Sequence, residues 1–287
     1  MDAAVKCTPL RLVTIRQEGT EEAAVALPDG VALVREVYGV PGESPDLLSL
    51  LVSGRFYELK EAYDRGGIRG GTPFRSSYGP LYRRPRKIWG IGLNYVEHAG
   101  DLSEAAPADE PASFMRPDTT IVGLGDEVVL PAQSERVTAE AELALVIGRE
   151  AKGVPEDEAP SVVAGFTTVL DMTAEDILRE NPRYLTRAKS FDTFFSFGPQ
   201  LVTPDEVEDI GALEVSTVLN GEVRRTNTVS NMTFSPWSLI SFHSKVMTLL
   251  PGDVISTGTP GAVVVREGDV AECRITGFEP LSNPVVR

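Results

Sequence analysis

The chain has 287 residues, of which 42% are hydrophobic, enough for one large domain or for a large domain with a small one. Its 27 basic and 42 acidic side chains give a formal charge of −15, which argues against a nucleic-acid-binding protein because phosphate neutralisation requires clustered Lys and Arg. The chain has only two cysteines, and its sequence shows no apolar stretch that could span a bilayer and no apparent secretory signal. We therefore expect a cytoplasmic protein without a membrane partner.

The first eighty residues are predicted to form a small N-terminal α/β module. Strands are expected in RLVTIRQ (11–17) and on both sides of the Pro-Asp-Gly turn at 28–30. An amphipathic helix with apolar residues at helical spacing should follow from about Asp46 to Leu59. The glycine-rich segment 64–73 is the best boundary, so we expect an N-terminal domain over 1–80 and a larger domain over 81–287.

Beyond that boundary, GLNYVEHAGD (92–101) carries His98, one of two histidines in the chain. If this stretch is helical, His98 and Asp101 lie at i and i+3, and a carboxylate that orients an imidazole is the usual arrangement for activating water. A surface histidine on a loop is an equally good interpretation. The other histidine, His243, lies in a helical apolar pattern and is interpreted as structural.

The stretch AEAELALVIG (139–148) contains two glutamates one residue apart. Alternate residues of a strand point to the same face, so Glu140 and Glu142 share a side with Ala144 and Val146. An exposed strand end would explain the pair. A divalent cation would also explain it, because a metal converts the repulsion between two carboxylates into coordination.

Asp171 ends the apolar run AGFTTVLD, where a strand meets an expected helix at 174–179. A carboxylate at such a place is most often a helix N-cap. It could also complete an oxygen ligand set with Glu140 and Glu142, and three carboxylates with waters would suit Mg²⁺ or Mn²⁺. The sequence leaves both interpretations open.

Lys189 lies in RAKSFDTFFSFGP, a segment rich in aromatic residues. Burying a lysine costs free energy unless it meets an anion, so Lys189 is either exposed or faces carboxylates or substrate. Further along, ISTGTPG (255–261) is a strand that runs into a glycine-containing turn. Its backbone N–H groups and hydroxyls could bind an anion, although a common tight turn has the same composition.

The remaining pattern is one of many strands broken by turns, with few helices, the longest expected over 235–250. This predicts a β-rich α+β fold, in which the sheet is rolled or barrel-like. No repeat, heptad pattern or low-complexity tract is present in the sequence.

Taken together, several weak motifs resemble the fumarylacetoacetate hydrolase family over about residues 86–287. They occur in consistent order and spacing: GLNYVEH, FMRP, EAELALVIG, GFTTVLDMTAED, AKSFDTFFSFGP, LNGE, PGDVISTGTPG and ITGFEPLSN. The resemblance implies a mixed β-roll catalytic domain, usually a homodimer. It also implies Mg²⁺ or Mn²⁺, for which Ca²⁺ could substitute, on three carboxylates that correspond to Glu140, Glu142 and Asp171.

The resemblance also implies roles for other residues. The family's catalytic histidine matches His98 and its active-site lysine matches Lys189. Its substrate-contacting loop threonine matches Thr259, beside Gly258, and a lysine common in FM-K is replaced by Arg116, which we expect to bind substrate.

Two differences from the family pattern bear on the substrate. The acidic partner of the histidine is commonly Glu in H-x-x-E and here is the shorter Asp101. Glu175 and Leu178 stand where many members have Arg and Gln, so we expect the distal group of the substrate to differ from that of better-known members.

The implied activity is hydrolysis of a C–C bond in a small 2,4-dioxo acid of the acylpyruvate type. The metal would chelate the carboxylate and 2-oxo oxygens and stabilise a pyruvate enolate, while His98 with Asp101 activates water and Lys189 holds a substrate oxygen. The alternatives are an isomerase or tautomerase, a hydratase, or an oxaloacetate-type decarboxylase acting on a related 2-oxo acid. A non-catalytic ligand-binding member is a further alternative.

Overall fold

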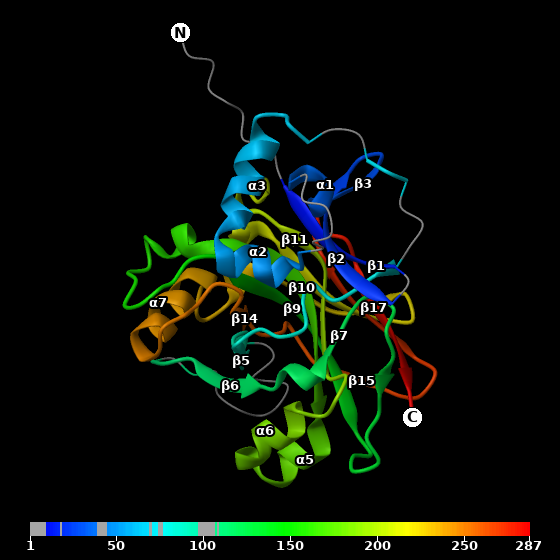
Figure 1. Ribbon diagram of the computed structural model, residues 1–287. Helices are drawn as coiled ribbons and strands as arrows, with labels where there is room; N and C mark the ends of the chain where they lie inside the picture. Colours follow the sequence, from blue (N-terminus) through cyan, green and yellow to red (C-terminus); the bar gives the residue numbers. More distant parts are fainter. Residues whose placement is uncertain are drawn as a thin grey trace.

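The two longest strands of the chain, β9 (Val137–Ile147) and β10 (Val163–Ala174), form an antiparallel pair at the centre of the computed structural model (Figure 1). The structure describes residues 10–17, 19–38, 45–68, 71–73, 77–96, 107 and 109–287. Every residue of β9 and β10 is buried, including the carboxylates Glu140, Glu142 and Asp171.

Within the described residues, β9 and β10 belong to a 12-stranded sheet whose main path is β3-β2-β1-β11-β10-β9-β14-β5-β6, with β15 beside β9, β4 beside β1 and β7 beside β11. The bounds of its other strands are β1 Arg11–Gln17, β2 Thr20–Leu27, β3 Gly30–Leu33, β4 Ser77–Tyr78, β5 Ile88–Gly92, β6 Ala112–Arg116, β7 Ile121–Val122, β11 Phe195–Val202, β14 Val254–Ser256 and β15 Val263–Val265.

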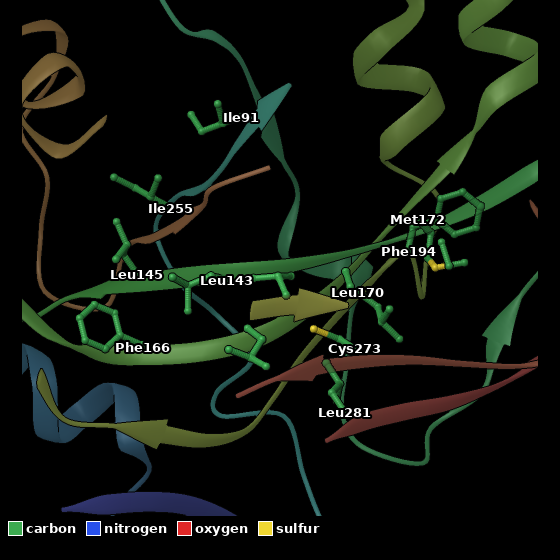
Figure 2. Close-up of a cluster of buried hydrophobic side chains, with 14 of the residues drawn as sticks. Ile91, Leu143, Leu145, Phe166, Leu170, Met172, Phe194, Ile255, Cys273 and Leu281 are labelled. Atoms are coloured by element: carbon green, nitrogen blue, oxygen red, sulfur yellow. The ribbon is translucent and has the colours of Figure 1, made fainter. Parts of the chain in front are cut away.

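A second sheet of five strands in the described part of the chain runs in the order β13-β12-β16-β17-β8. Its strands are β8 Val128–Val129, β12 Glu214–Leu219, β13 Glu222–Thr228, β16 Val270–Ile275 and β17 Leu281–Val286. The main core lies between the two sheets. In Figure 2 the side chain of Leu170 from the larger sheet lies beside Cys273 and Leu281 of the smaller one.

The helices are short and lie outside the sheets (Figure 1). Their bounds are α1 Val34–Tyr38, α2 Leu47–Ser53, α3 Arg55–Asp64, α5 Glu175–Glu180, α6 Leu185–Lys189 and α7 Pro236–Val246. Single 3₁₀ turns occur at Asp118–Thr120, Ala159–Val162, Pro182–Tyr184, Pro204–Glu206, Ile210–Ala212 and Val229–Asn231. In the described ranges no helix combines the length and the apolar character that crossing a membrane requires.

The helix expected from Asp46 to Leu59 begins as predicted but is interrupted. Asp46 is its N-cap and accepts a hydrogen bond from the Ser49 backbone N–H at 2.6 Å. Gly54 then adopts the left-handed conformation with φ 78° and ends α2, and α3 starts at Arg55. The prediction of one continuous helix is therefore wrong, because a left-handed glycine changes the direction of the chain.

The N-terminal strands extend the larger sheet. β1 pairs antiparallel with β11, with Leu12 opposite Leu201. Apolar side chains of α2 and α3 also share a core cluster with Ala144 and Val146 of β9. The predicted β-rich α+β class is confirmed, while the division of the chain at residue 80 stays a prediction.

Candidate functional site

Three carboxylates meet on one face of the β9–β10 pair. Glu140 lies directly opposite Asp171, and Glu142 is two residues along β9 and so points to the same face. Ala144 and Val146 continue that face into the apolar core shared with α2 and α3, as the strand period predicts. All three carboxylates are buried, and Asp171 has no exposed surface. They therefore do not form the exposed strand end that the sequence also allowed.

Lys189 comes from the last turn of α6 and faces these carboxylates. Its Nζ donates hydrogen bonds to Glu140 Oε2 at 2.9 Å and to Asp171 Oδ1 at 2.8 Å. The side chain is 6% exposed, so the ammonium is held by anions in a site with little water. The sequence allowed Lys189 to be either exposed or in contact with carboxylates or substrate, and in the structure it contacts carboxylates.

Arg116, at the end of β6, lies behind the carboxylates. Its guanidinium donates to Asp171 Oδ1, to the Lys189 backbone carbonyl and, at 3.1 Å, to the Met172 backbone carbonyl. Arg116 is buried, and it is not among the described residues that line the adjoining cavity. Its expected contact with substrate stays a prediction.

The loop after β14 holds Glu142. The Ser256 hydroxyl and the Gly258 backbone N–H donate to Glu142 Oε2 at 2.5 and 2.9 Å. Gly258 has φ +98°, and a Cβ at this position would lie 2.9 Å from the Cβ of Asn94. The Gly258 backbone N–H thus helps to orient the Glu142 carboxylate. The expected contact of Gly258 with substrate stays a prediction.

A cavity of about 390 Å³ opens beside Glu140, Lys189 and Thr259, the size of a small-molecule site. Its wall is mostly apolar. The described lining residues are Ile91, Gly92, Leu93, Ala112, Phe114, Thr138, Glu140, Thr173, Glu175, Leu178, Arg179, Pro182, Leu185, Lys189, Thr259 and Ala262.

Burial controls the electrostatics of the site. It raises the pKa of Glu142 to about 8, and the negative charge of Asp171 adds to the rise. Burial also raises the pKa of Asp171, although Arg116 and Lys189 oppose that shift. For Lys189, burial lowers the pKa but is outweighed by the charges of Asp171 and Glu140, so the pKa is raised. Burial thus disfavours the charged form of Glu142 and Asp171, and a further cation beside them would favour it.

A divalent cation fits this donor set. Asp171 Oδ2 is buried and has no hydrogen-bond partner, and carboxylate oxygens are the ligands that Mg²⁺ and Mn²⁺ prefer. The Lys189 ammonium is hydrogen-bonded to one oxygen of Glu140 and to one oxygen of Asp171. Among the described residues, no three acidic, His or Cys side chains lie close enough together to hold a metal ion without moving. Binding a cation would require these side chains to rearrange around the unbonded oxygen.

His98 and Asp101 lie outside the described residues, so the water-activating dyad stays a prediction. His243 is buried in α7, where its Nε2 accepts a hydrogen bond from Trp89 Nε1 at 3.2 Å. It is not a lining residue of the cavity. This buried position, away from the cavity, agrees with the interpretation of His243 as a structural residue.

Sequence reasoning missed several hydroxyls. The Thr173 hydroxyl donates to Glu140 Oε1 at 2.7 Å and that of Thr138 lies 3.3 Å from the same oxygen. Both could have been found, because each lies two residues from a carboxylate on its own strand. Thr217 of β12 accepts from the Ala141 backbone N–H at 3.1 Å and lies 3.3 Å from the Gly261 carbonyl. No local signal points to Thr217, which comes from the other sheet.

Comparison with known proteins identifies what this chain is similar to. Residues 87–286 match the family model described as fumarylacetoacetate (FAA) hydrolase C-terminal. The human mitochondrial oxaloacetate tautomerase FAHD2A is 40% identical over 212 residues, which cover 71% of this chain and 67% of that protein.

Two solved structures share the fold over nearly the whole chain. Maleylpyruvate hydrolase from Sphingobium sp. SYK-6, in complex with manganese(II) and pyruvate, is 28% identical with a TM-score of 0.79, and the match covers 96% of this chain and 98% of that one. The 5-carboxymethyl-2-hydroxymuconate delta-isomerase from Mycobacterium smegmatis is 31% identical with a TM-score of 0.69, covering 98% and 99%. The predicted fold is confirmed.

Proposed function

The chain belongs to the fumarylacetoacetate hydrolase family, whose members include hydrolases, isomerases and tautomerases. We propose that it is a metal-dependent hydrolase that cleaves a C–C bond in an acylpyruvate-type 2,4-dioxo acid. One observation carries the proposal. Three buried carboxylates share one face beside a cavity of about 390 Å³, and Asp171 Oδ2 is left without a partner. The structural similarity to a hydrolase that binds manganese(II) and pyruvate supports it.

Glu140, Glu142 and Asp171 would hold the divalent ion, Mg²⁺ or Mn²⁺. When bound, it supplies a Lewis acid for the carboxylate and 2-oxo oxygens of the substrate. Hydrogen bonds from Ser256 and Gly258 to Glu142, and from Thr173 to Glu140, would orient two of these ligands once the side chains have rearranged around the ion.

The other groups act on the substrate. Lys189 lines the cavity and its ammonium would stabilise negative charge that develops on a substrate oxygen. His98, oriented by Asp101, would remove a proton from water. The resulting hydroxide adds to the C4 carbonyl, and the C3–C4 bond breaks with its electron pair going to C3. Protonation at C3 completes pyruvate, and the C4 fragment leaves as a carboxylic acid.

A second reaction at the same site is keto–enol tautomerisation of a 2-oxo acid such as oxaloacetate. The similarity to the human oxaloacetate tautomerase favours it as the runner-up. Tautomerisation moves a proton to or from C3 and needs no attacking water. The two reactions are distinguished by their products, since only hydrolysis releases pyruvate and a second carboxylic acid.

The test follows acetylpyruvate and oxaloacetate by ultraviolet absorbance, with Mg²⁺ and with chelator, and measures pyruvate separately. We expect Mg²⁺-dependent pyruvate release from acetylpyruvate that is abolished in Glu142→Gln and retained in Glu150→Gln, an exposed glutamate just beyond β9. Interconversion of the oxaloacetate keto and enol forms without pyruvate release from acetylpyruvate would favour the tautomerase. Binding of 2-oxo acids with no turnover would favour a non-catalytic member. We also propose a cytoplasmic homodimer, which fractionation and analytical ultracentrifugation would test.

A further inference from the structure

Arg116 joins two elements of the candidate site. It is the last residue of β6, and its side chain is 1% exposed. Its guanidinium donates to the Asp171 carboxylate and the Met172 carbonyl of β10. It also donates to the backbone carbonyl of Lys189, the last residue of α6. A single side chain therefore links β10 to the end of α6.

The end of α6 depends on contacts outside the helix. α6 has five residues, and the last four carbonyls of a helix have no partner within it. The Lys189 carbonyl is among these, and the Arg116 guanidinium is its donor. The Lys189 backbone is thus held by β6, from which Arg116 extends.

Arg116 and Lys189 also meet at the same carboxylate. The Lys189 ammonium donates to Asp171 Oδ1 at 2.8 Å, and Arg116 donates to the same oxygen. Arg116 therefore holds the backbone of Lys189 and also the carboxylate that the Lys189 ammonium contacts. Loss of the guanidinium would release Lys189 at both of these points.

The shape of the guanidinium suits this arrangement. Its nitrogens form a rigid planar fork that can reach several acceptors at once, whereas a lysine carries its donors on one nitrogen. The Arg116 Cζ atom lies 5.6 Å from the ring centroids of Phe114 and Phe195, and these rings limit where the guanidinium can lie. A lysine at this position would keep the charge but lose the fork.

Lys189 and Arg116 differ in their access to the cavity. Lys189 lines the cavity, and Arg116 is not among the described residues that do. An ammonium that stabilises charge on a bound molecule must lie at the correct distance, since a misplacement of about 1 Å can lower a rate about 100-fold. Binding and rate should therefore depend on where Lys189 is held.

We propose that Arg116 is a positioning residue that sets where the Lys189 ammonium lies, through its bonds to the Lys189 carbonyl and to Asp171. By this means it controls how tightly the site binds the anion that Lys189 contacts. The inference rests on the proposed function, because it assumes that a 2-oxo acid is bound beside these carboxylates within reach of Lys189.

A double-mutant cycle at Arg116 and Lys189 tests the proposal. The probe is oxalate, which resembles a pyruvate enolate in charge and planar shape, and its affinity is measured by calorimetry at saturating Mg²⁺. We expect Lys189→Met and Arg116→Met each to weaken binding about tenfold or more, since each removes or misplaces a charge-assisted contact. The double variant should bind only about twofold more weakly than Lys189→Met alone, because residues that act through one another are not additive.

Two further variants separate geometry from charge. Arg116→Lys keeps the positive charge without the planar fork, so it should recover only part of the lost affinity. The same cycle with Arg116→Lys decides the question if the Arg116→Met proteins fail to fold. Arg86→Met, at an exposed position just before β5 and outside the cavity lining, should bind oxalate as the wild-type protein does.

Acetylpyruvate turnover is measured in parallel. Arg116→Met should lower kcat about tenfold or more and change KM less, because Lys189 acts mainly on charge that develops during the reaction. A residue that only stabilises the fold would leave the kcat of the folded protein unchanged.

The two proposals can fail separately. If the wild-type protein does not turn over acetylpyruvate, the hydrolase proposal fails, and the oxalate cycle still decides the role of Arg116. Four results would overturn the positioning proposal: additive losses in the cycle, complete recovery in Arg116→Lys, unchanged oxalate affinity in the folded Arg116 variants, or no oxalate binding by the wild-type protein.

Discussion

Glu140 and Asp171 face each other across β9 and β10, and the Lys189 ammonium donates to one oxygen of each, at 2.9 and 2.8 Å. The second oxygen of Glu140 accepts from Thr173, whereas that of Asp171 has no partner. Lys189 and a divalent cation would therefore share the same two anions. This relationship governs how the stability of the protein should respond to metal and to mutation.

Mg²⁺ should stabilise the folded protein. A ligand that binds the folded state alone adds about 2.7 kcal/mol to the free energy of unfolding at one hundred times its Kd. Urea unfolding at increasing Mg²⁺ measures the gain. We expect it to vanish in Asp171→Asn and to persist in Glu150→Gln, whose carboxylate is exposed beyond the site. An equal gain in Asp171→Asn would contradict the assignment of this ligand.

Lys189→Met should destabilise the metal-free protein by about 3 kcal/mol, because removing one partner of a buried ion pair leaves uncompensated charge. The loss should be smaller with saturating Mg²⁺, since the cation then neutralises the same carboxylates. Chemical unfolding with and without Mg²⁺ measures both values. The matched control is Lys245→Met, an exposed lysine of α7, for which we expect no significant change. A loss that does not depend on Mg²⁺ would argue against a shared site.

Gly258→Ala should cost more than Gly221→Ala. Both glycines have positive φ, at +98° and +82°. The left-handed conformation of an alanine at either position should therefore lower the free energy of unfolding by about 1 kcal/mol or more. An added Cβ has open space at Gly221 but lies 2.9 Å from Asn94 Cβ at Gly258. The variant at Gly258 should also weaken Mg²⁺ binding, because its N–H holds Glu142. Unfolding and calorimetry test the pair, and equal effects at both positions would contradict the prediction.

Thr217→Val should destabilise the protein by about 1–3 kcal/mol, since valine preserves the shape but leaves the buried Ala141 N–H without its acceptor. Ala141 lies between Glu140 and Glu142, so a few-fold loss of Mg²⁺ affinity should accompany the change. Thr276→Val, at an exposed position just after the neighbouring β16, serves as the control. Unchanged stability and affinity in Thr217→Val would remove Thr217 from the support of the site.

Stability should fall in mildly acidic solution because of His243. Burial lowers the pKa of its imidazole from 6.5 to about 4, so the unfolded chain binds more protons between these values. The folded state should therefore lose roughly 3 kcal/mol as the pH falls through this window, with no further loss from this group below it. His243→Gln, which can still accept from Trp89, should flatten this part of the profile in urea unfolding at a series of pH values. An unchanged slope would contradict this explanation.

Part of the site was predictable because it depends on local geometry. The strand period places Glu140 and Glu142 on one face with Ala144 and Val146, and the structure has them there. The burial cost of a lysine predicts that Lys189 meets an anion or is exposed. The order of the motifs identified the family, and the family model matches residues 87–286.

Other features depend on contacts between distant parts of the chain. The break at Gly54 depends on a left-handed turn that an apolar pattern over Asp46–Leu59 does not reveal. The hydrogen bonds from the Arg116 guanidinium to Asp171 and to two backbone carbonyls depend on such contacts, and its expected contact with substrate stays a prediction. His98 and Asp101 lie outside the described residues, and their pairing stays a prediction.

The sequence by itself determined which residue types could form a cation site, because strand alternation and residue chemistry are local properties. Only the tertiary structure decided that Asp171 lies opposite Glu140, because that depends on the register of two strands joined by a long connection. It also decided that Lys189 reaches both carboxylates and that Arg136 and Arg179 both pair with Glu175. Electrostatic partners are set by packing in three dimensions, and no spacing along the chain specifies them.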